Sequence, residues 1–575
     1  MTDARTPLEA IDSIEAWLGD PLDPGNPFAA DAILAADERA ELLAPGEQSL
    51  DEYGLGAEFV PHALGGRLRQ VDTLAQILRA VFRRDPTLAL GYGVTSYIAG
   101  APVWACGDSV QRKWMADVLL RHGKAAAAYN ELAHGNDFTR TELRASPRGG
   151  DLVLNGRKEL VNNVARAGAI VLFARTDDRP GNRAHSHLLL DPAAIPGDRW
   201  SQLPRFLTTG MRGCLLGGME FRDCPLPADC VIGEPGAGME TVLRAFQTTR
   251  GLIPAMAIGG LDTQLRLAMG FARERRMYGR ALAEIPHARS VLVNAFLDLL
   301  ISDCLATVTA RALHVLPGQT SVYTAAAKYL VPKTLHAAAY DLSVLLGARS
   351  YLREGPHALF QKTMRDVAVA TFGHANATVC QATMIPQLPR LAQRSWRSAG
   401  EPPSALFRFG DSLPDLDYGS LELTSRGEDS VTAVLPGSLA QTAGEPALRA
   451  LCEEFVAELM RLKDHCLALL GRDRTVVAGP WSFDLADRYT TALAAAACLG
   501  VFRTGGGGDP FLADPAWVTA ALWRLAGRLG REQRPLPAGL DQKIYAELQA
   551  RHDTGHAFDL ANRSLARAPE LRGTG

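Results

Sequence analysis

The chain has 575 residues, of which 60 are Lys or Arg and 63 are Asp or Glu, so its formal net charge is −3 at pH 7. A balance this close to neutral excludes a bulk electrostatic affinity for nucleic acid or for an anionic membrane, and we expect neither as a partner. The length exceeds what one hydrophobic core usually supports, and it predicts about three or four domains.

The first residues, MTDARTPLEAIDSIEAWLGD, contain early acids and lack an uninterrupted apolar segment, which argues against a signal peptide. We find no window of about 18 uncharged apolar residues that would predict a membrane span. The nine cysteines are scattered without a CxxC pattern. An odd, unpatterned count is typical of reduced thiols, so we expect a cytoplasmic protein.

Residues 1–125 are predicted to form a helical domain. Apolar residues recur at steps of three and four along one predicted helix, which places them on a single face. They are Leu74, Ile77, Leu78, Val81 and Phe82. The segment GDSVQRKWMADVLL (107–120) opens with Asp108 and Ser109 before an amphipathic run, a pattern typical of a capped helix start.

The pattern changes near Ala126, and residues 126–237 predict a β domain. DLVLNGRKELV (151–161) has two apolar runs around Asn155-Gly156, which predicts a hairpin with its turn at that pair. AGAIVLFART (167–176) and HSHLLLD (185–191) are further predicted strands.

Helical periodicity returns at Gly238 and persists to about residue 395. Residues 396–437 are rich in Pro and Gly and predict a linker or covering loop, and residues 438–575 predict an extra helical domain. Apolar residues of that last domain again share one helix face. They are Leu448, Leu451, Phe455, Leu459, Leu462 and Cys466. The order helical, β, helical, helical predicts an α+β chain, mostly α, made of separately packed domains.

Several segments carry a family resemblance. They are GLGAEFVPHALGG (54–66), GDSVQRKWMADVL (107–119), YNELAHGND (129–137), GMRGCLLGGMEF (210–221), LPADCVIGEPGAG (226–238), RERRMYGR (273–280) and GARSYLREGPHALFQKTMRD (347–366). In this order they resemble the motifs of the acyl-CoA dehydrogenase and acyl-CoA oxidase family of FAD flavoproteins. The resemblance implies an N-terminal helical domain, a central β-barrel-like domain and a C-terminal four-helix bundle, with residues 438–575 similar to the extra domain of longer oxidase-like members.

The resemblance also implies a chemistry. In the family, FAD lies between the β domain and the bundle, an acyl thioester of CoA or of an acyl carrier protein stacks on the flavin, and a Glu removes the α-proton. Here the position of that Glu, eight residues after Asp366, is His374, and the position of the alternative base is Thr249. Neither is a carboxylate, although Arg250 is retained beside the expected reacting carbon. A neutral imidazole can serve as a general base, so His374 and Arg250 are the predicted catalytic pair.

The flavin contacts implied by the resemblance are changed as well. Asn130 and Asn162 stand where the family has Thr, Asn136 where it has Ser, and Leu160 where it has a stacking Trp. An amide offers both a donor and an acceptor to the flavin, whereas Leu160 can only pack. Arg275 and Tyr278 match the Arg-x-x-Phe-Gly signature. In relatives the matching Arg reaches the FAD diphosphate of a neighbouring subunit, so a homo-oligomer is implied. It is a homodimer rather than a tetramer if residues 438–575 cover the surface that further copies would occupy.

Three functions stay open. The first is an FAD oxidoreductase of the EC 1.3 type acting on an acyl thioester. The second is the same fold carrying out oxygen-dependent flavin oxidation or hydroxylation, and the third is a catalytically inactive structural subunit. His374 also fits an ordinary structural histidine, the three asparagines fit turn residues, and Arg275 fits a surface ion pair. No metal site is predicted, because HExxH and paired-His patterns are missing from the sequence.

Overall fold

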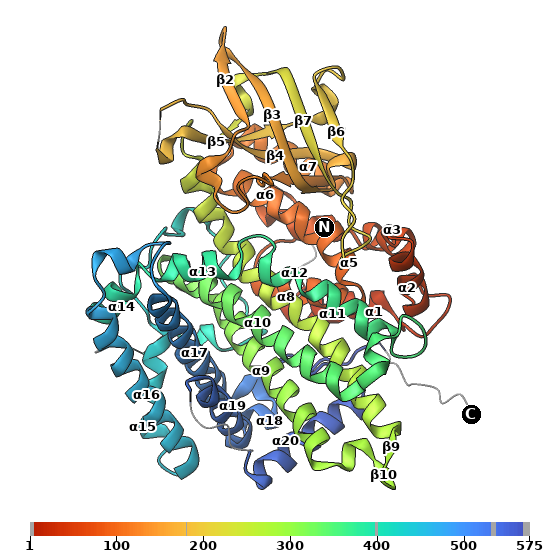
Figure 1. Cartoon of the computed structure of the whole chain (residues 1–575), viewed down its shortest axis with the longest axis vertical. Helices are drawn as coiled ribbons and strands as arrows, with labels where there is room; N and C mark the ends of the chain where they lie inside the picture. Colours follow the sequence, from red (N-terminus) through yellow and green to blue (C-terminus); the bar gives the residue numbers. More distant parts are fainter. Residues whose placement is uncertain (1–4, 180, 397–400, 531–535, 567–575) are drawn as a thin grey trace.

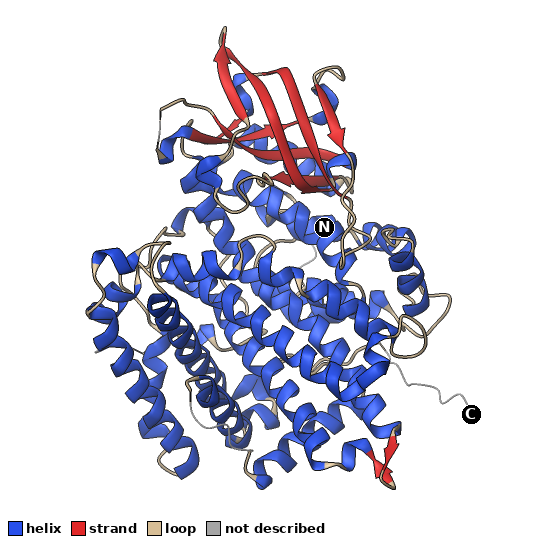
Figure 2. Cartoon of the chain, in the orientation of Figure 1, coloured by secondary structure: helices blue, strands red, loops and turns tan. Residues whose placement is uncertain are grey.

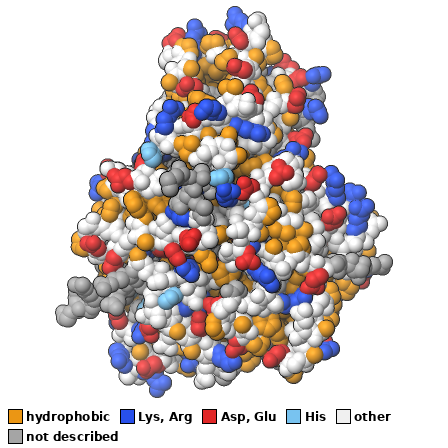
Figure 3. Space-filling model, turned by 180° about the vertical axis from the view of Figure 1, so that it is seen from behind, with side chains coloured by type: hydrophobic (Ala, Val, Ile, Leu, Met, Phe, Trp, Pro, Cys, Tyr) orange, Lys and Arg blue, Asp and Glu red, His pale blue; other side chains and the backbone are white. Residues whose placement is uncertain are grey.

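The computed structural model describes residues 5–179, 181–396, 401–530 and 536–566. A β-sheet domain lies at one end of the molecule and a large body of helices forms the rest (Figures 1 and 2). Basic and acidic side chains are interspersed over the face seen in Figure 3, as the near-neutral net charge predicts. The two parts meet where the helices α6 (Thr95–Cys106) and α8 (Gly238–Glu274) pack against strands of the sheet.

The N-terminal part is helical as predicted. Its helices are α1 (Pro7–Leu18), α2 (Ala30–Glu38), α3 (Ala44–Tyr53), α4 (Val71–Arg84), α5 (Pro86–Leu88), α6 (Thr95–Cys106) and α7 (Ser109–Leu120). All five residues of the predicted apolar face of α4 are buried. The carboxylate of Asp108 accepts the backbone N–H groups of Val110 and Gln111, so the predicted cap of α7 is confirmed.

Eight strands form one mixed sheet. They are β1 (Lys124–Ala128), β2 (Arg144–Arg148), β3 (Asp151–Asn162), β4 (Ala167–Arg175), β5 (His185–Leu190), β6 (Trp200–Leu203), β7 (Leu216–Leu226) and β8 (Val231–Ile232). The order is β6-β7-β3-β2-β4-β5-β8, and β1 pairs with β4 in parallel. All eight strands therefore come from residues 124–232, which lie between two helical stretches of the chain.

The predicted hairpin turn at Asn155-Gly156 is wrong. The strand β3 runs straight through this pair, and the turn is Gly149-Gly150, where φ is +62° and +95°. Gly156, at φ +114°, instead lies at a shift of register against β7, where the Asn155 side chain bonds Asp223. Asn-Gly suits any positive-φ site, and the pairing with β7 decides that this one is a bulge.

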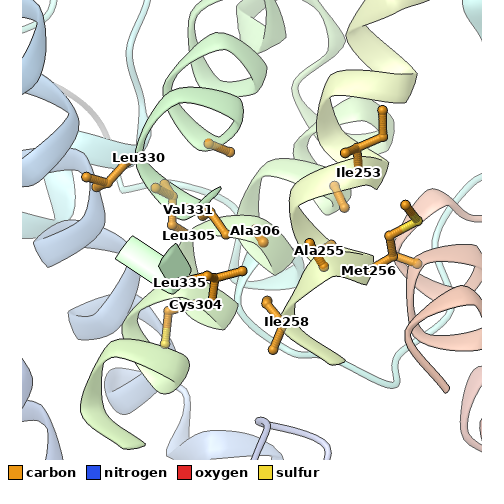
Figure 4. Close-up of a cluster of buried hydrophobic side chains, with 14 of the residues drawn as sticks. Ile253, Ala255, Met256, Ile258, Cys304, Leu305, Ala306, Leu330, Val331 and Leu335 are labelled. Carbon is orange, nitrogen blue, oxygen red and sulfur yellow. The ribbon is translucent and has the colours of Figure 1, made fainter. Parts of the chain in front are cut away.

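Three long helices form the centre of the helical body. They are α8 (Gly238–Glu274), α9 (Pro286–Val315) and α10 (Thr320–Leu346). Their apolar side chains meet in the cluster of Figure 4, to which α8 brings Ile253 and Ile258, α9 brings Leu305, and α10 brings Val331 and Leu335. The helix α9 is long and apolar enough to cross a membrane by length and composition, but 89% of that window is buried inside the protein.

Short helices follow α10 and line one side of it. They are α11 (Ala358–Val367), α12 (Val369–Phe372), α13 (Ala377–Met384) and α14 (Leu388–Arg394). A small hairpin, β9 (Arg276–Met277) with β10 (Arg280–Ala281), joins α8 to α9. Figure 1 shows this hairpin at the end of the molecule opposite the sheet domain.

The C-terminal helices are α15 (Val434–Gln441), α16 (Pro446–Leu467), α17 (Pro480–Arg503), α18 (Pro510–Ala513), α19 (Pro515–Arg528) and α20 (Ala538–Asp553). Among them, α17, α19 and α20 pack against α9, and α17 also packs against α10 (Figure 1). The predicted apolar face of α16 is buried throughout. The preceding segment, residues 401–433, also packs onto the body, and its Asp429 accepts hydrogen bonds from Tyr323, Trp396 and Tyr489.

A buried ion network ties distant parts of the chain together. Arg79 of α4 donates to Asp303 of α9 at 2.6 Å and to Asp559, beyond α20, at 2.9 Å. Arg83 pairs with Glu15 of α1 and contacts Asp559 as well. Because each charge has a partner of opposite sign, the network tolerates burial, and it locks the C-terminal segment onto the N-terminal helices.

Candidate functional site

The predicted catalytic residue His374 lies in a tight connection between α12 and α13. His374 and Ala375 have φ values of +51° and +73°, so two consecutive non-glycine residues are left-handed. The Asn376 side chain then accepts the N–H of Val379 at 2.9 Å and caps α13. Left-handed backbone is costly for residues with a Cβ, so surrounding contacts must hold this connection in place.

The two positions matched to alternative bases meet in space. Thr249 Oγ1 of α8 lies 2.5 Å from His374 Nε2, although 125 residues separate them in the chain. The same hydroxyl lies 3.1 Å from the carbonyl of Phe246 and is placed to donate to it. With its proton so used, the hydroxyl accepts from Nε2–H, and Nδ1 is then the imidazole nitrogen free to accept a proton.

Two buried cations flank His374. Arg250, which follows Thr249 in α8, is 4% exposed. Lys328 of α10 is 1% exposed, and its ammonium donates to the carbonyls of Ala370 at 2.6 Å and of Gly373 at 3.0 Å. These two bonds hold the C-terminal end of α12 and the peptide before His374, and they account for how the left-handed connection is maintained.

This environment makes His374 a weak base. Burial, and then the charges of Lys328 and Arg250, hold the pKa of His374 well below its usual value. Burial also lowers the pKa of Lys328 to about 8, with Arg250 acting in the same direction. Burial raises the pKa of the neighbouring Cys380 thiol, so it stays neutral. The site therefore holds a neutral imidazole beside positive charge, and no carboxylate of the described residues pairs with either cation.

Three of the predicted flavin contacts of the sheet domain lie on or against the strand β3, and the fourth lies in the loop after β1. The Asn162 amide donates to Thr95 Oγ1 at 3.0 Å, while its own oxygen is buried without a partner. Leu160 has φ +57° and is 37% exposed. The carbonyl of Asn130 accepts the N–H of Glu159 at 3.1 Å, so this residue lies against the same strand β3. Asn136 is partly buried in the loop after β1.

Arg275 and Tyr278 lie elsewhere. Both are exposed, Tyr278 to 89%, at the hairpin that ends α8. The 25 residues from Arg250 to Arg275 span about 37 Å at the rise of an α-helix. Within one chain these two residues therefore cannot join the site around His374, and only a second chain could bring them there.

A buried aromatic patch adjoins the site and was not predicted from the sequence. Its members lie on β4, β5 and α8 or in the loop after β1, and neighbouring ring centroids are 5.0–6.4 Å apart. They are Tyr129, Phe138, Phe173, His185, His187 and Phe246. The Tyr129 hydroxyl and the ring nitrogens of both histidines are buried without partners. Burial lowers the pKa of His187 to about 3, so its imidazole is neutral. The alternation of His185 and His187 along β5 was the only available signal, because both face one side of the sheet.

The residues of this chain fit the ring end of FAD better than its diphosphate end. The orphaned buried oxygen of Asn162 offers an acceptor to a ring N–H, and the uncovered Leu160 offers an apolar surface on the same strand. A diphosphate requires cations, and the predicted one, Arg275, is remote within the chain. The fit is therefore complete only if a second chain supplies Arg275.

Comparisons with known proteins agree with this architecture. Residues 236–379 match the family model of the acyl-CoA dehydrogenase C-terminal domain. The human mitochondrial short-chain specific acyl-CoA dehydrogenase is 27% identical over 328 residues, which are 56% of this chain and 78% of that protein. The FAD complex of PigA superposes with a TM-score of 0.60 at 18% identity, covering 68% of this chain and 98% of that one. The prolyl acyl carrier protein oxidase AnaB gives 0.56 at 19% identity, with 66% and 97% covered.

The structural matches are below 25% identity and establish the fold, which is that of the acyl-CoA dehydrogenases. The family model matched by residues 236–379 and the sequence relatives agree with this fold, and they show that the chain is similar to acyl-CoA dehydrogenases. The predicted fold class is thereby confirmed.

Proposed function

We propose that this protein is an FAD-dependent oxidoreductase that acts on an acyl thioester of CoA or of a carrier protein, without the carboxylate base. The observation that carries the proposal is the meeting of Thr249 and His374 beside Arg250, because the two alternative base positions of the family converge here on one point. PigA with FAD supports the cofactor, and the human dehydrogenase and AnaB support a thioester substrate. FAD, when bound, would supply the hydride acceptor.

The residues of the chain would then act as follows. Asn162 and Asn130 orient the ring and Leu160 packs against it, with Asn136 near the polar part of the cofactor. Thr249 holds Nε2 of His374, so that Nδ1 faces the incoming proton, and Lys328 keeps the loop in place. A positioned base contributes roughly 10²–10⁴-fold to rate, and the low basicity of His374 places it at the lower end of that range. We therefore expect slow dehydrogenation of simple saturated acyl-CoAs.

Absorption spectroscopy tests the proposal. The purified protein should carry a flavin spectrum, which should bleach anaerobically with a suitable acyl thioester. His374→Glu restores the family's base, so it should bleach faster with acyl-CoAs than the wild type, whereas His374→Gln should bleach more slowly. Rapid bleaching that survives His374→Gln would refute the role of His374. Failure to take up any flavin would favour a structural subunit.

A second candidate is oxygen-dependent flavin oxidation or hydroxylation. The site holds two buried cations and a weak base, and such chemistry does not depend on removing a proton from a saturated α-carbon. Flavin that is reduced by an external donor, and that then consumes oxygen faster when substrate is present, would favour this candidate over thioester dehydrogenation.

We also propose that the working form is a cytoplasmic homodimer. Tyr340, Val344 and Tyr351, at the end of α10 and just after it, are 59%, 64% and 90% exposed, an unusual density of uncovered large apolar side chains. A second copy covering them would also be able to deliver Arg275 to the cofactor. Sedimentation should show a dimer at micromolar concentration, and a flavin-loaded monomer would contradict the proposal.

A further inference from the structure

Arg250 is a buried cation without an anion. Seven arginines of the described chain are buried, namely Arg79, Arg83, Arg84, Arg250, Arg266, Arg311 and Arg551. Six of them lie within 4.0 Å of a carboxylate. Arg250 is the exception, since it has no ion pair and no side-chain hydrogen bond among the described residues, and its Nε is buried without a partner. Within the described part of the chain, every buried guanidinium group except the one beside His374 is paired with a carboxylate.

The neighbours of Arg250 do not supply the missing charge. Lys328 is a second buried cation, and its ammonium is satisfied by two carbonyls, which carry no net charge. His374 and the Cys380 thiol are neutral there, because burial lowers the pKa of the first and raises that of the second. An isolated buried charge is costly, so a group of opposite sign from outside the chain would be bound strongly.

The surroundings indicate what kind of anion fits. The Phe246 ring centroid lies 4.1 Å from that of His374 and 5.0 Å from that of Tyr129. Beyond them, His187 and the Tyr129 hydroxyl present unpartnered polar atoms within a buried aromatic wall. A guanidinium matches a carboxylate through two parallel hydrogen bonds, and an aromatic wall suits an apolar or planar body. One free guanidinium balances one negative charge, which favours a carboxylate over a diphosphate.

We propose that Arg250 binds a carboxylate of the substrate, with the apolar body of that ligand lying against Phe246 and Tyr129. This deepens the proposed function and rests on it for the identity of the reaction: the thioester that reaches the flavin would carry a free acidic group besides its thioester. The anion would replace the carboxylate that the chain lacks at positions 249 and 374. Binding of the carboxylate itself does not require flavin.

Calorimetry and thermal unfolding of the full chain test the proposal, with benzoate and cyclohexanecarboxylate as probes. Benzamide is the neutral control of the same shape, and pyrophosphate tests the cofactor's diphosphate as the source of the anion. Wild type should bind the carboxylates at least about 10-fold more tightly than benzamide and should unfold at a higher temperature in their presence. Arg250→Met should abolish this discrimination, while Arg273→Met, at the exposed far end of α8, should retain it.

The variants also separate the possible outcomes. Without ligand, Arg250→Met should unfold at the same or a higher temperature than wild type, because it removes an uncompensated buried charge. A large destabilisation, with carboxylate binding unchanged, would overturn the proposal. If Arg250→Met does not fold, Arg250→Lys serves instead, and it should still prefer the carboxylate over the amide but bind the carboxylate more weakly than wild type does. Equal binding of benzoate and benzamide by wild type would refute the proposal. Tighter binding of pyrophosphate than of benzoate would assign the site to the cofactor.

The two proposals fail separately. Arg250-dependent carboxylate binding in a protein that takes up no flavin would leave this inference standing and remove the proposed function. If the flavin bleaches with uncharged acyl thioesters but the protein does not bind benzoate, the proposed function stands and the carboxylate-binding role of Arg250 is refuted.

Discussion

Lys328→Met should change how the stability of the protein depends on pH. The ammonium of Lys328 is buried without a carboxylate, and burial lowers its pKa from 10.5 to about 8. Between those two values the unfolded chain binds a proton that the folded chain does not, so the free energy of unfolding rises with pH in wild type. At about 1.36 kcal/mol per pH unit, the gain reaches about 3 kcal/mol between pH 8 and pH 10.5.

Methionine has a similar length and no titrating group, so this gain should vanish in Lys328→Met. Urea unfolding of both proteins at pH 7, 8, 9 and 10 measures the difference. Wild type should gain stability relative to the variant above pH 8, while the difference should be constant below pH 8. Lys333→Met, which removes an exposed lysine from the same helix, is the matched control and should follow wild type. A pH-independent difference between wild type and Lys328→Met would refute the account of Lys328 as an unpaired buried cation.

Three further predictions address the rest of the fold. Asp559→Asn should lower the free energy of unfolding by about 3–5 kcal/mol, because it leaves Arg79 short of a buried partner, and urea unfolding with stability equal to wild type would contradict this. His187→Phe should protect the protein against acid, because the pKa of His187 is about 3 in the folded protein and 6.5 in the unfolded chain, so wild type loses stability as the pH falls between these values. Coinciding acid-unfolding curves of the two proteins would contradict this prediction. Gly150→Ala should cost about 1 kcal/mol or more at φ +95°, and a melting temperature equal to wild type would show that the turn tolerates a Cβ.

The motif counts anticipated part of the site. His374 stands eight residues after Asp366 and Thr249 directly precedes the retained Arg250, so the motif spacing alone predicts both positions. Their contact across 125 residues of chain required the packing of α8 against the connection between α12 and α13. The identity of a residue at a motif position is local information, whereas its partner depends on how helices cross.

The hairpin shows a limit of local reasoning. Asn155-Gly156 and Gly149-Gly150 both permit positive φ, and the stronger turn signal was the wrong one. The choice depended on β7, whose Asp223 bonds Asn155 from more than 60 residues away. A turn and a bulge use the same residue types, so only the partner strand distinguishes them.

The spacing of apolar residues predicted the helical and β segments, because it indicates which face of each element is buried, and the faces of α4 and α16 were both confirmed. The sequence by itself also showed that positions 249 and 374 are not carboxylates. The packing of the helices was needed to show that Arg250 and Lys328 are buried with no anion among the described residues, and that Arg275 lies about 37 Å along α8 from the site. Burial and charge compensation are sums over neighbours from every part of the chain, and no local pattern of residues contains them.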